Sequence, residues 1–336
     1  MTNLVTGGSG FIGSHIVEAL LRRGERVRIL DIREPADPPR GIEHLSGSVT
    51  DPSAVEAAMK GVEAVFHTAA NAHLWAPDKR VFEELNVGGT RIVLEAAERA
   101  KVARFVHTSS ATVLVGRKRM PALVDESRQL GEADMAGPYP LSKLRAENEV
   151  RRAAVRGLHA TLVLPTVPIG ASDIGMTAPT RMIADFVRGR TPAFVECVLN
   201  LIDVRDVAEG HVLARDKGRL GERYILGHRN MTLSALLALL ETTTGIAMPT
   251  RRVPYGLAVA AALVSEAWAD WVSHAAPKAS LTGIRLIGSP IALSSAKAVR
   301  ELGLPQSSIE TALSSAVAWL VERGIVDPPP AFQSRF

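Results

Sequence analysis

Three glycines spaced three residues apart constrain the fold of this chain more than any other feature. They lie between an apolar segment at residues 4–6, which predicts a β-strand, and a helical pattern at residues 11–23. In such a turn the first glycine allows a tight strand exit, the second lets the backbone approach a pyrophosphate, and the third lets helix and strand pack closely. The helix N-terminus adds partial positive charge for the phosphates. The turn therefore predicts dinucleotide binding, with contacts from Gly7, Ser9, Gly10, Phe11, Ile12 and Gly13.

Two other glycine motifs are excluded here. A hydrolase nucleophile turn needs a glycine where Phe11 stands, and a P-loop needs a Gly-Lys-Ser/Thr sequence that does not follow. An ordinary glycine-rich turn can occur in any context, whereas this turn lies between a predicted strand at residues 4–6 and a predicted helix at residues 11–23, as a dinucleotide-binding turn requires. The flanking pattern therefore favours the dinucleotide-binding interpretation.

Asp31 ends the second predicted strand, about 20 residues beyond the glycine turn. A carboxylate at this place accepts hydrogen bonds from the adenosine ribose hydroxyls and repels a 2′-phosphate. It therefore predicts NAD as cofactor and makes NADP the less favoured alternative. Arg33 lies two residues further on and would weaken this preference, unless it is only a surface arginine.

Short apolar strands alternate with longer helical patterns through the first half of the chain. Strands are predicted at residues 27–30, 42–45, 62–67, 104–107 and 160–164, and helices at 78–99 and 139–156. Asp51 and Pro52 mark the start of a further helix. This alternation predicts an α/β fold, with a Rossmann-type doubly wound parallel sheet covered by helices on both faces.

The regular alternation breaks after Pro165, which suggests two domains. We expect residues 1–165 to form the NAD-binding Rossmann domain, joined by a returning segment at about 200–228. Residues 166–199 and 229–327 are expected to form a smaller, mostly helical C-terminal substrate domain, with a helix around 181–187 and helix starts at Thr232, Ser294 and Ser308. Residues 328–336, which include three consecutive prolines, predict a loose tail.

Composition narrows the class of protein. The chain has 336 residues, of which 46% are hydrophobic and 4% aromatic, and its formal net charge is +4. The longest basic run is Gly116-Arg117-Lys118-Arg119, so no nucleic-acid partner is expected. A single cysteine, Cys197, excludes an internal disulfide and fits a reducing, cytoplasmic location. No export signal is visible, and the apolar run at 257–264 is too short to span a membrane.

A serine, a tyrosine and a lysine form the candidate catalytic group. Ser110 follows the strand at 104–107, so its hydroxyl would face the crevice at the carboxyl ends of the strands. Tyr139 and Lys143 are one helical turn apart. A phenol with a pKa near 10 is a poor base at neutral pH, and a nearby ammonium together with a positively charged nicotinamide would lower that pKa. A strand-end cap and a surface lysine are the alternatives for Ser110 and Lys143.

The segments TGGSGFIG, HTSSATV and YPLSK, in this order, resemble the extended short-chain dehydrogenase/reductases, the NAD-dependent epimerase/dehydratase family. The resemblance implies a catalytic triad of Ser110, Tyr139 and Lys143 and a small-molecule substrate. It also implies a homodimer formed by the helices that follow Asp78 and Tyr139. The further cofactor contacts that it implies are Asp31, Ile32, Arg33, Ser48, Val49, His67, Ala69, Ala70, Tyr139, Lys143, Pro165, Thr166 and Val167.

Several segments resemble one branch of this family more closely. Residues 73–78, 168–170, 186–206 and 221–227 are similar to the hopanoid-associated sugar epimerases, a branch near dihydroflavonol reductases and 3β-hydroxysteroid dehydrogenases. Three departures from the family pattern stand out. Ser48 replaces an aspartate expected to meet the adenine, Leu164 replaces an asparagine, and residues 286–290 replace a basic cluster. The last two remove polar groups that a nucleotide-sugar diphosphate would need.

The common chemistry is hydride transfer between NAD and a secondary alcohol carbon. We expect an oxidoreductase that acts on a hydrophobic, steroid- or terpenoid-like hydroxy or keto compound. A nucleotide-sugar epimerase or dehydratase is the alternative, and Arg181 and Arg285 would then bind the diphosphate. A non-catalytic NAD-binding protein is the third. The segment from Tyr255 to Trp271 would line an apolar pocket or fill the core. No metal site is expected, because the histidines form no His-x-x-x-His pair.

Overall fold

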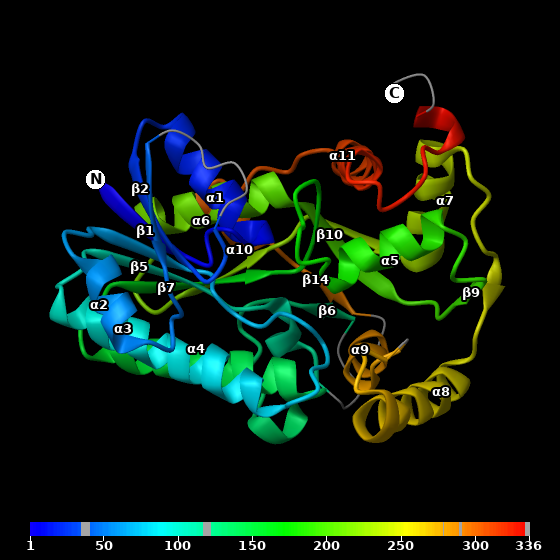
Figure 1. Cartoon of the computed structure of the whole chain (residues 1–336), viewed down its shortest axis with the longest axis horizontal. Coiled ribbons are helices and arrows are strands. Elements are labelled where there is room, and N and C mark those ends of the chain that lie inside the picture. Colours follow the sequence, from blue (N-terminus) through cyan, green and yellow to red (C-terminus); the bar gives the residue numbers. More distant parts are fainter. Residues whose placement is uncertain (35–40, 117–121, 278, 289–290, 333–336) are drawn as a thin grey trace.

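A seven-stranded parallel sheet forms the centre of the protein (Figure 1). The computed structural model describes residues 1–34, 41–116, 122–277, 279–288 and 291–332. From one edge to the other, the sheet contains β11 (Arg223–Leu226), β7 (Ala160–Pro165), β5 (Arg104–Thr108), β4 (Ala64–His67), β1 (Thr2–Thr6), β2 (Arg26–Asp31) and β3 (Ile42–Ser46). All neighbouring strands are parallel, so the predicted Rossmann-type sheet is confirmed.

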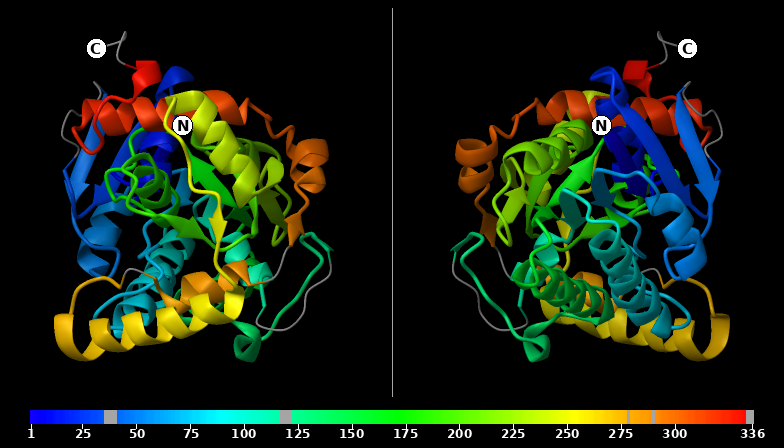
Figure 2. Two further views of the ribbon diagram at one scale, coloured as in Figure 1. Left: turned by 90° about the vertical axis from the view of Figure 1, so that its right-hand side faces the viewer. Right: turned by 90° about the vertical axis from the view of Figure 1, so that its left-hand side faces the viewer.

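Helices cover both faces of this sheet, as parallel crossover connections require. One face carries α1 (Phe11–Arg22), α6 (Val204–Lys217) and α10 (Ala296–Leu302). The other carries α2 (Pro52–Met59), α3 (Gly89–Arg99) and α4 (Pro138–Val155). A π-helix, η1 (Phe82–Gly88), leads into α3, and the views in Figures 1 and 2 show the sheet lying between the two helical layers.

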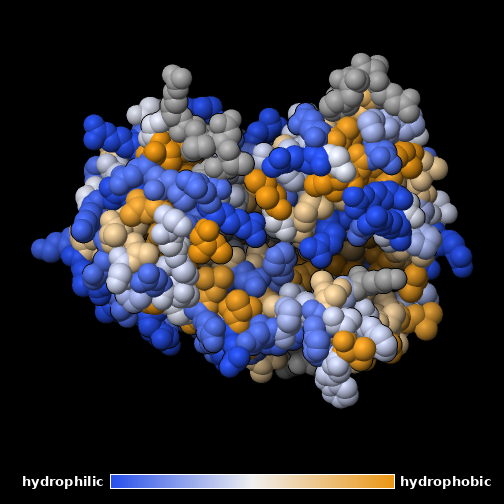
Figure 3. All heavy atoms as spheres, viewed as in Figure 1, coloured by the Kyte–Doolittle hydropathy of each residue, from blue (hydrophilic) through white to orange (hydrophobic). Residues whose placement is uncertain are grey.

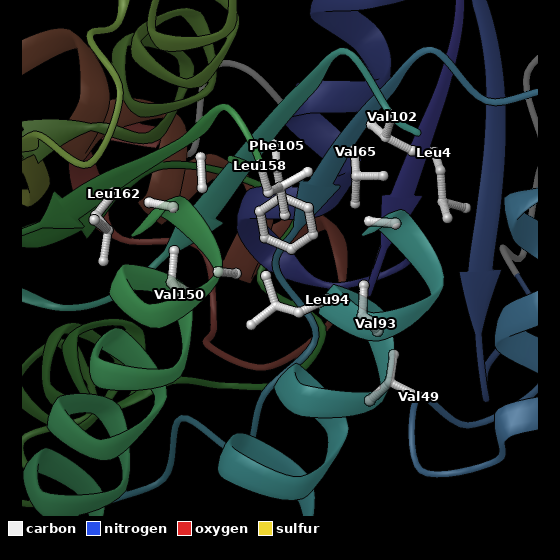
Figure 4. Packing of buried hydrophobic residues seen from close by; sticks show 14 of the residues in the cluster. Leu4, Val49, Val65, Val93, Leu94, Val102, Phe105, Val150, Leu158 and Leu162 are labelled. Carbon is white, nitrogen blue, oxygen red and sulfur yellow. The ribbon is translucent and has the colours of Figure 1, made fainter. Parts of the chain in front are cut away.

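Side chains along each strand alternate between two hydrophobic cores. On β5, Phe105 packs under α3 and α4, whereas Val106 packs under α1 and α6. Figure 4 shows Phe105 facing Leu94 of α3 and Val150 of α4. Strands β4, β7 and β11 are buried at every residue, which explains why their sequences are mostly apolar rather than alternating, whereas the edge strand β3 has no buried residue.

A second, smaller sheet begins where the regular alternation of the sequence ends. It contains β8 (Val167–Ile169), β10 (Val198–Asp203) and β12 (Arg229–Thr232), with β10 parallel to β8 and antiparallel to β12. Helices α5 (Ala178–Val187), α7 (Leu233–Thr244) and α11 (Ile309–Glu322) contribute to a separate hydrophobic core beside it. After β10 the chain returns to the main sheet through α6 and β11.

The remaining elements are short or lie at the outer edge. Two further pairs of strands join distant segments: β9 (Ala193–Phe194) with β13 (Arg251–Arg252), and β6 (Leu123–Val124) with β14 (Ala292–Leu293). The other helical elements are η2 (Ala111–Leu114), η3 (Glu132–Asp134), α8 (Tyr255–Trp268), η4 (Ala269–Ser273) and α9 (Leu281–Ile287). In the part of the chain that the structure describes, no helix is long and apolar enough to cross a bilayer.

Most predicted helix starts agree with the structure. The side chains of Asp51, Thr232 and Ser308 each accept a hydrogen bond from the first turn of the helix that follows. The exception is α10, whose N-cap is Ser295 rather than the predicted Ser294. The predicted basic run falls on residues 117–119, which lie outside the described residues.

The predicted loose tail is wrong as far as residue 332. A 3₁₀-helix, η5 (Pro330–Phe332), begins at the last of the three prolines, and Phe332 is buried in the core around α7 and α11. Gly245, which ends α7 with a φ of 73°, lies against Pro330: a Cβ atom there would be 3.4 Å from the Pro330 Cβ atom. Burial of the Phe332 ring removes a large apolar area from water. The free energy gained in this way outweighs the preference of the prolines for an extended conformation.

Phe332→Ala should therefore destabilise the protein. A buried phenylalanine truncated to alanine costs about 3 kcal/mol in free energy of unfolding, because contacts are lost and a cavity remains. The measurement is the midpoint of urea unfolding followed by circular dichroism. Val155→Ala, at a side chain on α4 that is 90% exposed, is the control and should leave the midpoint unchanged. Equal midpoints for both variants would contradict the burial of Phe332.

Candidate active site

The glycine turn lies at the carboxyl edge of the main sheet. The amide of Gly7 donates to the carbonyl oxygen of Leu30 at 2.9 Å, and Gly10 donates to the carbonyl of Gly7 at 3.0 Å. A Cβ atom on Gly13 would lie 2.1 Å from the Gly7 carbonyl oxygen. No side chain fits there, so glycine at position 13 is what allows α1 to start directly above β1.

The chain after β4 packs directly onto this turn. A Cβ atom on Gly7, whose φ is 71°, would lie 2.7 Å from the backbone of Ala69. Ala69 thus lies against the glycine turn, and its predicted contact with the cofactor, like that of Ala70, stays a prediction. The imidazole of His67 is turned inward, where Thr6 Oγ1 lies 2.8 Å from Nδ1 and Thr90 Oγ1 lies 2.9 Å from Nε2. Burial, with a smaller effect of the Lys143 ammonium, lowers the pKa of His67 to about 3.

Asp31 joins the second strand to the glycine turn. Its Oδ2 atom accepts a hydrogen bond from the Ser9 amide, and its Oδ1 atom accepts one from the Arg33 amide, both at 2.9 Å. Ile32 and Arg33 are exposed beside it. Ser48 is half-buried after β3, and Val49 is buried against Gly89 of α3. The Asp31 carboxylate therefore lies at the edge of the glycine turn and is hydrogen-bonded to the backbone amides of Ser9 and Arg33.

The structure brings Ser110, Tyr139 and Lys143 together. Ser110 follows β5 and caps η2, where its Oγ atom accepts from the amide of Thr112 at 3.2 Å and from the Thr112 hydroxyl at 2.9 Å. Tyr139 is buried in the first turn of α4 and shares a side-chain hydrogen bond with Ser110. One turn later, Lys143 Nζ donates to the carbonyl oxygen of Thr108 at 2.7 Å.

Burial dominates the acid–base properties of this group. It lowers the pKa of Lys143 to about 8, while the carboxylate of Glu147 acts in the opposite direction. Burial also raises the pKa of Tyr139, and the hydrogen bond with Ser110 opposes this rise. The lowering of the Tyr139 pKa that Lys143 together with a positively charged nicotinamide would cause stays a prediction.

Glu147 is a buried neighbour that sequence reasoning missed. It lies one turn beyond Lys143 on the same face of α4, and none of its side chain is exposed. The Ser109 hydroxyl donates to Oε1 at 2.6 Å, and Arg151 and Arg223 approach Oε2 at 3.3 and 3.7 Å. The continued four-residue spacing from Tyr139 was the signal that could have revealed it.

A layer of buried histidines lies beneath Lys143. The ring of His107 lies tilted by 34° against that of His67, with 5.5 Å between ring centroids, and neither ring nitrogen of His107 has a hydrogen-bond partner. On the other face of β5, His211 Nε2 lies 2.9 Å from Thr108 Oγ1. Burial lowers the pKa of His107 well below its usual value and that of His211 to about 4. Burial therefore disfavours the protonated form of all three rings, and Lys143 is the cationic group beside Tyr139.

The predicted substrate-side arginines differ in their surroundings. Arg285 on α9 donates to the carbonyl of Ala136 at 3.4 Å, close to the start of α4. Thr282 of the same helix packs so tightly on Gly137 that a Cβ atom there would lie 2.1 Å from its hydroxyl oxygen. Arg181 on α5 is exposed and donates only to the carbonyl of Met176, at 3.3 Å.

Apolar residues adjoin Tyr139 on the substrate side. Ala76 and Phe82 are buried against its ring, and Leu74 and Val81 pack partly against them. Figure 3 shows a hollow lined by hydrophobic residues between the part of the surface that carries α5 and the part that carries α8 and α9. At the end of β7, Thr166 donates from its amide to Leu226, which fixes the predicted stretch Pro165, Thr166 and Val167 beside β11.

The segment from Tyr255 to Trp271, which was expected to line an apolar pocket or to fill the core, contributes only alanines to the buried residues: Ala258, Ala262 and Ala269. Trp268 is 61% exposed and Trp271 is 85% exposed. The tryptophans therefore do not fill the core, and the pocket interpretation stays a prediction. In the described part of the chain, no group of three or more His, Cys, Asp or Glu residues could hold a metal ion.

Comparison with known proteins identifies the family. Residues 3–227 match the model of the NAD dependent epimerase/dehydratase family, which is more than half of the chain. The chain belongs to this family. It is therefore an enzyme of the extended short-chain dehydrogenase/reductase kind, and its resemblance to that group is confirmed.

Similar proteins span nearly the whole length of this family member. Sterol demethylase protein B of Methylococcus capsulatus is 35% identical over 331 residues, which cover 97% of this chain and 100% of that protein. A 4-hydroxy-2-methyl-3-oxo-4-farnesyl-3,4-dihydroquinoline-1-oxide ketoreductase of Stigmatella aurantiaca is 34% identical over 312 residues, with coverage of 90% and 91%. The crystal structure of gox2253 has a TM-score of 0.83 and 36% identity, covering 97% of this chain and 99% of that one.

The residues at the sheet edge fit the nicotinamide dinucleotide that the family uses. The cradle at Gly7 and Gly13 is closed to any Cβ atom, which leaves backbone amides and the N-terminus of α1 facing the crevice. Asp31 supplies a carboxylate at the end of β2, where a ribose would lie. The glycine turn and Asp31 would thus hold the pyrophosphate and the adenosine ribose.

The buried lysine predicts a particular dependence of stability on pH. The pKa of Lys143 is about 8 in the folded protein and near 10.5 when unfolded, so the unfolded chain binds more protons between these values. The free energy of unfolding should therefore rise with pH in this window, by about 3 kcal/mol relative to Lys143→Met. Urea unfolding at several pH values measures the difference.

Lys60→Met, at an exposed site, is the control and should follow the wild type. A pH-independent difference between wild type and Lys143→Met would contradict the low pKa.

Proposed function

We propose that this family member is an NAD-dependent oxidoreductase that interconverts a secondary alcohol and a ketone on a hydrophobic, steroid- or terpenoid-like compound. NAD, when bound, accepts or supplies the hydride. The observation that carries the proposal is the meeting of Ser110, Tyr139 and Lys143 at the carboxyl edge of the sheet, next to the glycine turn.

Each of the three side chains has a separate role in this mechanism. Ser110 donates a hydrogen bond to the substrate oxygen, and Tyr139 moves a proton to or from that oxygen. Lys143, anchored on the Thr108 carbonyl, holds a positive charge one turn from the phenol and stabilises its ionised form. Glu147 opposes the effect of burial on the pKa of Lys143 and so helps to keep the lysine charged.

A hydrophobic substrate is supported by the surroundings of Tyr139. Ala76 and Phe82 pack on its ring, and the neighbouring hollow in Figure 3 is lined by hydrophobic residues. The names of two relatives point to the same class, since one refers to a sterol and the other to a farnesylated ketone. We therefore favour an apolar ring or isoprenoid body in the hollow, with its oxygen at Tyr139.

The surroundings of Arg181 support a second candidate function, that of a nucleotide-sugar epimerase or dehydratase. Its guanidinium is exposed and its one hydrogen bond is a long one to a carbonyl on the preceding turn. Arg181 is therefore available for a diphosphate, together with Arg285. In that reaction the cofactor is regenerated within each cycle, so no net NADH accumulates.

Two expectations from the sequence are retained as proposals. One is a homodimer through α3 and α4, whose outer faces carry the ion pairs Arg91–Glu149 and Arg156–Glu98 within one chain. The other is a cytoplasmic location, which fits a single cysteine, Cys197, whose thiol is buried. Light scattering of the purified protein would test the dimer.

Tyr139→Phe should abolish turnover without loss of the fold. Removal of the proton-transferring group is expected to lower kcat about a thousandfold. The assay combines NAD with a panel of hydroxysteroids and terpenoid alcohols and a panel of UDP- and GDP-sugars. It follows NADH absorbance together with sugar composition.

The matched control is Tyr224→Phe, at a buried tyrosine of β11 outside the site, which should retain activity. Net NADH from an apolar alcohol supports the dehydrogenase, whereas interconverted sugars without net NADH support the epimerase. Undiminished turnover in Tyr139→Phe would overturn the mechanism for both.

Asp31→Ser should relax the preference for NAD over NADP. The substitution removes a carboxylate that would repel the 2′-phosphate, so the ratio of NAD to NADP affinities should fall at least about tenfold. Binding of each reduced cofactor is measured by its fluorescence on titration with protein. Asp51→Ser, which retains an N-cap on α2 away from the turn, is the control. An unchanged ratio would assign the preference to residues other than Asp31.

A further inference from the structure

Helix α8 and the π-turn η4 present an outward face that consists of apolar side chains. The exposed residues of these two elements up to residue 272 are Tyr255, Gly256, Leu257, Ala260, Ala261, Leu263, Val264, Ala267, Trp268, Trp271 and Val272. The larger of them are strongly exposed: Leu257 is 64%, Val264 72% and Trp271 85% exposed. No charged residue lies on this surface, which we call the α8 face.

The polarity of this helical segment is opposite to that of an ordinary surface helix. Its inward contacts are made by small residues, because Ala258, Ala262 and Ala269 are the buried ones. Its two acidic residues also turn toward the protein. Glu266 accepts from the amide of Leu281 at 2.7 Å, and Asp270 accepts from Trp75 Nε1 at 2.8 Å and from Lys79 Nζ at 2.9 Å.

The segment is firmly attached to the parts of the chain that flank the active site. Asp270 is joined to Trp75 and Lys79, which lie in the loop between β4 and η1. Helix α9 packs against α8 and, through Thr282, against Gly137 at the start of α4. The α8 face is therefore an outer surface of the elements that surround Tyr139.

The dimensions of the α8 face argue against a second copy of the chain as its partner. Fourteen residues of α8 and 5 of η4 form a strip about 28 Å long at 1.5 Å per residue. With one helical diameter of about 10 Å, this gives about 300 Å². A stable dimer buries about 800 Å² per partner. The helix also lies at the outer edge of the molecule in the ribbon views (Figures 1 and 2).

A lipid bilayer needs no matching concave surface, and the residue types fit its interface. Tryptophan is enriched at the boundary between head groups and acyl chains, and aliphatic side chains enter below it. With 14 residues, α8 is too short to span a bilayer. Arg251 and Arg252 are exposed just before the helix, and the net charge of +4 favours an anionic surface.

We propose that the α8 face docks the protein onto the surface of an anionic bilayer, with Leu257, Val264, Trp268 and Trp271 inserted among the lipids. The docking does not depend on the substrate. If the proposed function holds, it places the elements around the active site beside the phase in which a hydrophobic substrate is dissolved.

Vesicle binding in the absence of substrate and cofactor tests this surface. Vesicles of phosphatidylcholine with phosphatidylglycerol are titrated and protein is separated by flotation. The double variant Val264→Glu/Trp271→Glu should bind at least about tenfold more weakly, because charge is placed where lipid would be. Leu220→Glu, at an exposed leucine in the turn between α6 and β11, is the control and should bind as the wild type does. Tyr139→Phe should also bind normally, which separates this proposal from the proposed function.

Tryptophan fluorescence gives a second measurement that needs no variant. Trp75 and Trp319 are buried, so a blue shift on vesicles, and quenching by brominated lipid, would report on Trp268 and Trp271. Failure of the wild type to bind, or binding that the double variant retains with normal circular dichroism, would overturn the proposal. Loss of a dimer in the double variant, without vesicle binding by the wild type, would also overturn it and assign the face to a second copy.

Discussion

All strands of the central sheet run in the same direction, and the rest of the site depends on this constraint. Parallel strands require crossover connections, so helices cover both faces and all carboxyl ends meet at one edge. The glycine turn after β1, Asp31 at the end of β2 and Ser110 after β5 therefore converge although they are far apart in the chain. The glycine at position 13 lets α1 approach this edge closely enough to direct its N-terminus at a ligand.

Helix α4 adds the groups that perform acid–base chemistry. Tyr139, Lys143 and Glu147 follow one another at four-residue intervals along its buried face. A charge buried in this way is costly unless it is hydrogen-bonded and paired. The Thr108 carbonyl binds the ammonium, and the Ser109 hydroxyl and two arginines surround the carboxylate. The Lys143 ammonium is thus held near the Tyr139 phenol by a continuous set of buried, hydrogen-bonded polar groups.

Sequence reasoning failed where side-chain burial depends on contacts between distant segments. Phe332 was expected in a loose tail but is buried by α7 and α11. The segment that carries Trp268 and Trp271 was expected to line a pocket or to fill the core, yet its buried positions belong to alanines and both tryptophans are exposed. In each case local residue type is compatible with both environments, and only the packing partners decide between them.

The sequence by itself determined the class of fold, the dinucleotide turn and the pairing of Tyr139 with Lys143. These features depend on short-range geometry: the φ angle that only glycine accepts readily at position 7, and the 3.6-residue period that puts residues four apart on one side of a helix. Only the tertiary structure decided which charges are buried, that Glu147 stands behind Lys143, and that α8 turns its apolar side outward. These outcomes depend on water being excluded by segments far apart in the chain, and no local pattern encodes that exclusion.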